Sequence, residues 1–226
     1  TPSVLQITVT NTGTAPLTVT SIVSDLGDFV PDLTGTPNIV LAALTGSQVI
    51  NVTFTPSLAG LRTGNLTFTH DDPVAGSLSV VSMTGTGTAP IFGVTPTSLI
   101  FGNVNVGTPS VLPITVTNTG TGPLTVTNVV SDHGNFVPDL TAFVVAAGAN
   151  QVVNVTFTPT ATGALSQSLT FTHDAAGSPS VVTMTGTGTA PVFSVAPNPL
   201  AFGNVNVGTP SVLPITVTNT GTGPLT

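Results

Sequence analysis

The chain has 226 residues, a net charge of −7 and a single basic residue, Arg62. One cation cannot neutralise the phosphates of nucleic acid or hold a protein on anionic lipid, so both kinds of partner are excluded. The absence of cysteine removes disulfides and thiolate chemistry. No apolar run reaches the roughly 18 residues that a membrane-spanning helix needs, so no membrane insertion is expected in this segment.

Internal repeats define the predicted domain organisation. The string TPSV begins at Thr1, Thr108 and Thr209. The repeats predict an Ig-like repeat over 1–90 that lacks its first strand, a complete Ig-like repeat over 91–190, and the opening strands of a third repeat over 191–226. Because the pattern is cut at both ends, we expect the natural polypeptide to be longer.

The complete repeat is expected to open with a strand over about residues 97–106, in which Val104 and Val106 point inward. The later segments alternate apolar residues with Thr, Asn or Ser, a pattern that predicts half-buried strands. Asn118 and Gly120 are expected in a turn outside the core. The residues expected in the core are Leu112, Ile114, Val116, Val155, Phe157, Leu169 and Phe171.

Clusters of Gly, Pro, Asn, Asp and Ser separate these segments, and no stretch shows a sustained helical period. About seven short strands in about 100 residues are typical of a two-sheet sandwich. The predicted fold class is therefore all-β, with tandem immunoglobulin-like antiparallel β-sandwiches. Phe and aliphatic residues must fill the core, because the chain has neither Trp nor Cys.

Two groups of polar residues were considered for chemistry. Asp25, Asp28 and Asp32 are weak Ca²⁺ candidates, because closely spaced carboxylates suit that ion. Histidine followed by aspartate, at His70 and His173, could form a metal ligand pair or an acid–base pair. For both groups, a polar turn bonded to nearby backbone is the commoner role. Without a third metal ligand or a G-x-S-x-G motif, we expect no enzyme activity and no required cofactor.

The motifs F-G-x-V-x-V-G, I-T-V-T-N-T-G-x-x-P-L-T, V-x-F-T-P, L-x-F-T and M-T-G-T-G follow one another in the repeat. In this order they resemble the abnormal-spindle/hydin (ASH) type of Ig-like repeat, which in bacteria occurs in large surface proteins with choice-of-anchor repeats. The resemblance implies a scaffold or binding module and brings no catalytic residues. Its ciliary and centrosomal members are rich in charge, whereas this chain has 4% charged residues, which does not favour an intracellular scaffold.

Residues 192–208 copy the strand that the first repeat lacks. The apolar residues of this copy are candidates for continuing the array into a further repeat or into another copy of the protein: Phe193, Leu200, Phe202, Val205 and Val207. Two arrangements stay open. Either the polypeptide continues covalently, or the segment inserts into the next subunit.

The expected surface is rich in Thr, Ser, Asn and Gly, so little charge repulsion opposes contact between copies. Exposed sheet edges also lack the Lys and Glu that usually block edge pairing. These features predict a self-associating structural repeat of an extracellular or cell-surface filament, stalk or sheath, whose partners are other copies or further repeats of the same protein. The alternative is an adhesin or a carbohydrate-binding surface array.

Overall fold

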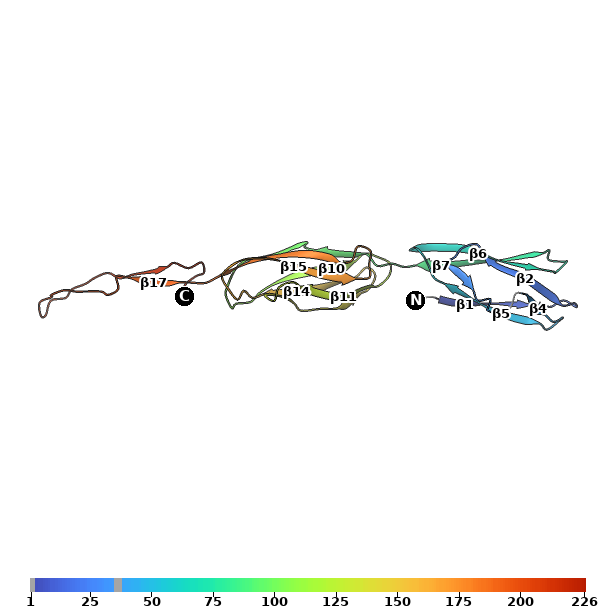
Figure 1. Ribbon diagram of the computed structural model, residues 1–226, viewed down its shortest axis with the longest axis horizontal. Coiled ribbons are helices and arrows are strands. Elements are labelled where there is room, and N and C mark those ends of the chain that lie inside the picture. The colour runs from blue at the N-terminus through green and yellow to red at the C-terminus, as the bar shows by residue number, and fades with distance from the viewer. Residues whose placement is uncertain (1–2, 35–37) are drawn as a thin grey trace. The chain divides into compact units, whose positions relative to one another are not determined.

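The computed structural model describes residues 3–34 and 38–226, which form β-strands joined by turns and loops, with no helix among them (Figure 1). The all-β class predicted from the sequence is confirmed. The chain divides into two compact units, unit 1 (Thr1–Ala89) and unit 2 (Pro90–Thr226). Within the described residues, no helix is long and apolar enough to cross a membrane.

Unit 1 contains two sheets whose described strands pair antiparallel, in the orders β1-β5-β3 and β4-β2-β6-β7. Their strands are β1 (Ser3–Thr10), β2 (Leu17–Ser24), β3 (Phe29–Pro31), β4 (Ile39–Leu41), β5 (Ser47–Phe54), β6 (Gly60–His70) and β7 (Leu78–Gly87).

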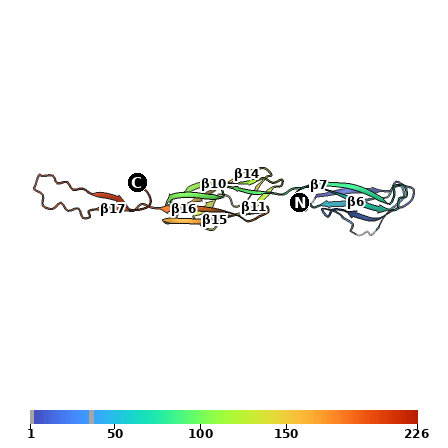
Figure 2. The same ribbon diagram turned by 90° about the horizontal axis from the view of Figure 1, so that it is seen from above.

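Unit 2 contains two larger sheets, in the orders β12-β14-β10-β8 and β13-β11-β15-β16-β9, and a two-stranded ribbon, β17-β18 (Figures 1 and 2). Its first strands are β8 (Phe92–Thr95), β9 (Ser98–Asn105), β10 (Ser110–Asn118), β11 (Leu124–Ser131), β12 (Phe136–Pro138) and β13 (Phe143–Val145). They are followed by β14 (Asn150–Phe157), β15 (Gly163–His173), β16 (Ser180–Thr189), β17 (Phe193–Ala196) and β18 (Thr216–Asn219).

The two units repeat one pairing scheme. The pair β1–β5 sets Ser3 opposite Phe54, and the pair β10–β14 sets Ser110 opposite Phe157. The second sheets correspond in the same way, and the pairs β2–β6 and β11–β15 both carry a register shift at the same place in the strand. The strands β1 to β7 of unit 1 therefore have counterparts in β10 to β16 of unit 2.

The core of unit 2 is built around packed Phe rings. Phe136 and Phe157 stack with their ring centroids 4.5 Å apart, and Phe101 packs on both at 5.6 and 5.4 Å. A Cβ at Gly186 on β16 would come within 2.5 Å of the Phe157 ring, so a side chain there would displace the ring. Of the residues expected in the core, all are buried except Leu112, which is half-buried and packs against the core.

Two positions differ from the sequence expectation. Val106 does not point inward: β9 ends at Asn105, Val106 lies in the following turn, and its side chain is 37% exposed. Leu99, Phe101 and Val104 are the inward residues, because an irregularity in pairing near Gly102, where φ is +68°, shifts the alternation by one residue. Gly120 lies in the expected turn.

Asn118 is not outside the core but is the buried last residue of β10, 1% exposed. Its Nδ2 donates to the backbone carbonyls of Gly122 and Val145, at 2.8 and 3.0 Å. Its Oδ1 accepts from the N–H groups of Gly120 and Ile91, at 3.0 and 3.2 Å. A buried amide persists here because it satisfies backbone groups from four places in the chain.

Candidate functional site

The candidate site is the pair of incomplete sheet edges in unit 1. In unit 2, β8 pairs antiparallel with β10, and β9 pairs parallel with β16. Within the described residues, β1 pairs only with β5 and β7 only with β6. The edges that β8 and β9 cover in unit 2 have no such partner strands among the described residues of unit 1.

The uncovered edges expose side chains that are core residues in unit 2. Val182 and Met184 on β16 are fully buried, whereas Val81 and Met83, their counterparts on β7, are half-buried. Phe54 is likewise half-buried, although its counterpart in unit 2 has no exposed surface. Within the described residues, these side chains of unit 1 are therefore less covered than their counterparts in unit 2.

The larger of two grooves lies along β7 and has a volume of about 540 Å³. Its lining includes Phe29, Phe54 and Met83. Phe29 and Phe54 stack at 4.8 Å, as Phe136 and Phe157 do in unit 2. Because Phe101 from β9 covers that second pair of rings, the groove is the place that a phenylalanine of a β9-like strand would fill.

The smaller groove lies beside β1 and has a volume of about 250 Å³, with Val9, Phe68 and His70 in its lining. In unit 2 the corresponding place is taken by Phe92 of β8. The Phe92 ring lies parallel to the ring of His173 at 4.1 Å and packs against Phe171 at 5.8 Å. Both grooves of unit 1 therefore match positions that one continuous segment, β8 with β9, occupies in unit 2.

Residues 192–208 carry the same sequence pattern as that segment. The counterpart of β8, β17, pairs with β18 and sets Phe193 opposite Asn219, as Phe92 lies opposite Asn118. The counterpart of β9 forms no strand. Figures 1 and 2 show this part of the chain as the extended loop that follows β17.

The five residues that the sequence assigned to continuation of the array are exposed or half-buried. Phe193, Phe202, Val205 and Val207 are exposed, and Leu200 is half-buried. The counterparts of Leu200, Phe202 and Val205 in β9 are all buried. The counterpart of Val207 is the turn residue Val106, so Val207 belongs to the outward side of the segment.

The three Ca²⁺ candidates are each bound to a separate partner. The carboxylate of Asp25 accepts from the backbone N and side-chain Nδ2 of Asn65, at 2.7 and 3.0 Å. The carboxylate of Asp32 accepts from the backbone N and hydroxyl of Thr34, at 3.1 and 2.7 Å. Among the residues that the structure describes, no three His or Asp side chains gather in a way that could hold a metal ion.

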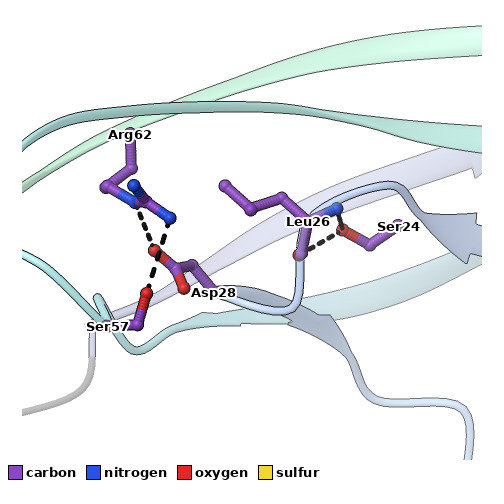
Figure 3. Close-up of polar contacts among 5 residues, drawn as sticks. All are labelled: Ser24, Leu26, Asp28, Ser57 and Arg62. Atoms are coloured by element: carbon purple, nitrogen blue, oxygen red, sulfur yellow. Dashed lines mark hydrogen bonds and ion pairs between the residues drawn. The ribbon is translucent and has the colours of Figure 1, made fainter.

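Asp28 forms an ion pair with the single basic residue of the chain. Arg62 Nε donates to Asp28 Oδ2 at 2.6 Å, and Arg62 Nη2 lies 3.4 Å from the Ser57 hydroxyl (Figure 3). The hydrogen bond from Arg62, followed by a contribution from Ser57, lowers the pKa of Asp28. In unit 2 the two positions hold Asn135 and Leu165, so the pair is replaced there by uncharged residues.

The histidine–aspartate motifs do not form acid–base pairs. His70 Nε2 and His173 Nε2 lie 2.8 and 3.1 Å from the hydroxyls of Ser79 and Ser180. The aspartate that follows each histidine instead accepts from a backbone N–H of the neighbouring strand, at 2.7 Å for Asp71 and 2.9 Å in unit 2. The backbone bond from Thr18 lowers the pKa of Asp71. The motifs therefore tie the strand end to β2 and β11.

The model of the family described as abnormal spindle-like microcephaly-associated, ASPM-SPD-2-Hydin (ASH) matches residues 86–181. The resemblance noted in the sequence is confirmed over these residues. No curated protein matches the chain in sequence.

Several solved structures are similar. A protein of unknown function from Porphyromonas gingivalis is 17% identical, with 83% of this chain and 91% of that chain covered and a TM-score of 0.40. An ASH/PapD-like domain of human CEP192 is 14% identical, with 43% and 84% covered and a TM-score of 0.39. The Pseudomonas aeruginosa CupB2 chaperone is 11% identical, with 80% and 91% covered and a TM-score of 0.31.

Proposed function

We propose that this chain is a structural, non-enzymatic tandem Ig-like repeat of an extracellular or cell-surface filament, stalk or sheath, in which sandwiches associate with further sandwiches of the same sequence. The observation that carries this proposal is the recurrence of one strand-pairing scheme in both units, with exposed valines and almost no charge on their strands.

The polar residues support a structural role. The carboxylates considered for metal binding and the aspartates that follow the histidines bond to backbone groups or to side chains of their own unit. Their hydrogen bonds stabilise turns and strand ends and leave no cluster of free ligands among the described residues. A binding loop usually presents aromatic or Arg anchors, and Arg62, the single arginine, is held by Asp28.

The exposed apolar side chains support self-association. Outward positions in the strands of unit 2 hold not only threonine but also exposed valines, among them Val130, Val144 and Val181. Apolar surface with little charge to repel a second copy promotes contact between chains. A protein that works outside the cell as a repeated building block can use such contacts.

Electron microscopy of the purified protein in negative stain tests this proposal. We expect fibres or bundles that lengthen as the protein concentration rises. Isolated particles at every concentration, together with specific retention on a carbohydrate array, would instead support an adhesin or a carbohydrate-binding array. Antibody labelling of intact native cells tests the location, since a surface filament is labelled without permeabilisation.

A further inference from the structure

We infer that a second copy of this chain docks on the outer face of the sheet β13-β11-β15-β16-β9 of unit 2, through the same face of its own unit 2. This face, the valine face, consists of the outward side chains of these five strands. The inference deepens the proposed self-association and rests on it. It adds the surface, the strands that form it and the symmetry of the contact.

Four exposed aliphatic residues stand on the valine face. Val130 of β11 and Val181 of β16 both pair with Thr170, so they flank it on neighbouring strands. Val144 extends from β13 beside β11, and Ile100 extends from β9 beside β16. Each of the four is between 48% and 73% exposed. This apolar area lies outside the core of unit 2, so only a partner can remove it from water.

The same outward positions are apolar and exposed in unit 1. Val23 and Val80 flank a threonine across β2, β6 and β7, in the arrangement that Val130 and Val181 have in unit 2. The outward valine of β13, Val144, also has an exposed valine as its counterpart on β4, although both of its inward neighbours differ between the units. A valine that is kept outside while its buried neighbours change indicates a role on the surface.

Charge distinguishes the valine face from the opposite face of unit 2. Within the described strands of the valine face, no outward residue is charged. The opposite sheet, β12-β14-β10-β8, also exposes valines, but the carboxylate of Asp139 accepts there from the backbone N and Nδ2 of Asn154, both at 2.8 Å. Every copy carries a net charge of −7. Two copies that meet through the opposite face would bury like charges, whereas the valine face buries none.

Two carboxylates border the valine face. Asp132 follows β11 and Asp174 follows β15, and they accept from the backbone N–H groups of Ser168 and Thr125, each at 2.9 Å. Backbone N–H groups of a strand point within the plane of the sheet, so these carboxylates lie beside the strands and not above them. They give the apolar centre a hydrated polar rim, which is the usual composition of a protein interface.

A projecting side chain and a hollow lie next to each other on the valine face. Ile100 is 73% exposed. Beside it is a hollow of about 300 Å³, whose lining includes the small residues Ala164, Ser166 and Thr187. A face with both features can pack on a copy of itself about a two-fold axis, with Ile100 of each copy in the hollow of the other. The contact is therefore closed and pairs two copies side by side.

The area of the valine face is sufficient for a specific contact. Its width over five strands and its length along β15, from Ala164 to Thr172, give a face of roughly 19 Å by 27 Å. Two such faces bury about 1,000 Å² in total, which is the area that a specific interface needs. Stacked sheets lie about 10 Å apart, so the valines and threonines of the two copies can interdigitate.

Two matched variants of the full chain test the docking by analytical ultracentrifugation. Val181→Glu alters the valine face, and Val111→Glu makes the same change on the opposite sheet. The two valines lie on interior strands and are 56% and 54% exposed. We expect Val181→Glu to weaken association by about tenfold or more, because the contact buries the added carboxylate of both copies. Val111→Glu should change association by less than about twofold, since its carboxylate stays in water.

Introduced cysteines test the same face without adding charge, because the natural chain has none. Thr183→Cys places a thiol on β16 in the valine face, and Val152→Cys places one on β14 of the opposite sheet; both positions are exposed. The reagent is a bismaleimide long enough to span the roughly 10 Å between stacked sheets. We expect the chain with Thr183→Cys to form cross-linked dimers several times faster than the chain with Val152→Cys.

The outcomes separate the docking from the proposed function. A chain that stays monomeric at every concentration overturns both the docking and the proposed self-association. Association that both glutamate variants weaken equally, or cross-linking with no preference between the two thiols, overturns the docking but leaves self-association in place. Selective loss with Val181→Glu, together with selective cross-linking through Thr183→Cys, supports the docking.

Discussion

Replacing Asn118 by alanine should destabilise unit 2 far more than a surface substitution would. The side chain is buried, and its loss removes hydrogen bonds to Gly122, Val145, Gly120 and Ile91. The two bonds to carbonyl groups are themselves buried. Leaving a buried polar group without a partner costs about 1–3 kcal/mol, so two such carbonyls set the expected loss at about 3 kcal/mol.

The measurement is calorimetry of the full chain, in which unit 1 serves as an internal reference. For a domain of this size, a loss of about 3 kcal/mol lowers the melting temperature by roughly 10–20 °C. Only the transition of unit 2 should move. A shift equivalent to less than about 1 kcal/mol would refute the reasoning, because it would mean that water replaces the amide at little cost.

Asn219 provides a matched control for this experiment. It occupies the equivalent position in the third copy of the motif and makes similar local bonds, to Gly223, Gly221 and Val192, at 2.7, 3.0 and 3.1 Å. Its surroundings are exposed rather than buried. Asn219→Ala should therefore leave the melting temperature of the unit 2 sandwich unchanged within about 2 °C, since water can satisfy the freed groups.

Phe157→Ala should destabilise unit 2 by about 3–5 kcal/mol in urea unfolding, because it leaves a cavity beside Phe136; a loss under about 1 kcal/mol would mean that the inward face is misassigned. Arg62→Leu should lower the melting temperature of unit 1, because it leaves the buried Asp28 without its ion-pair partner. Adding Asp28→Asn to that variant should restore part of the lost melting temperature. Equal melting temperatures of the single and the double variant would contradict this reasoning. Burial lowers the pKa of His173, so the unfolded chain gains a proton first as the pH falls below about 6.5. Unit 2 should therefore lose stability below that pH and keep it above, and His173→Gln should flatten the profile. Chelator should leave the unfolding midpoints unchanged, and a fall of many degrees would revive a metal site at the aspartates.

The period-two pattern was enough to identify most of the core, because alternation in a strand translates directly into inward and outward side chains. It placed Ile114, Val116 and Phe171 correctly. It failed at Val106, because the pairing irregularity near Gly102 and the end of β9 both depend on the partner strand β16. A positive φ at a glycine can be suspected from sequence, but its effect on register cannot.

Asn118 could not be placed from its own sequence neighbourhood. NTGTGP has the composition of an exposed turn, and the first residue of such a turn is usually solvated. What buries it is the carbonyl of Val145 and the N–H of Ile91, each 27 residues away in the chain. The recurrence of Asn at positions 11, 118 and 219 was the available signal. The exact repeat of FGNVNVG, from Phe101 and from Phe202, was a stronger signal, because it predicted which segment of the third repeat corresponds to β9.

The pairing of β9 with β16 has a mechanical consequence. These strands run parallel, with pairs from Ser98 and Thr183 to Asn105 and Thr189, and they lie near the beginning and the end of the sandwich in the chain. Tension applied to the polypeptide on either side of the sandwich pulls β9 and β16 in opposite directions along their length. The hydrogen bonds between them are then sheared together instead of being opened one after another, as they would be in a hairpin pulled apart from its ends. Because β8 precedes β9 in the chain and pairs with β10, the β8–β10 pairs and the β9–β16 ladder would both resist stretching of the sandwich.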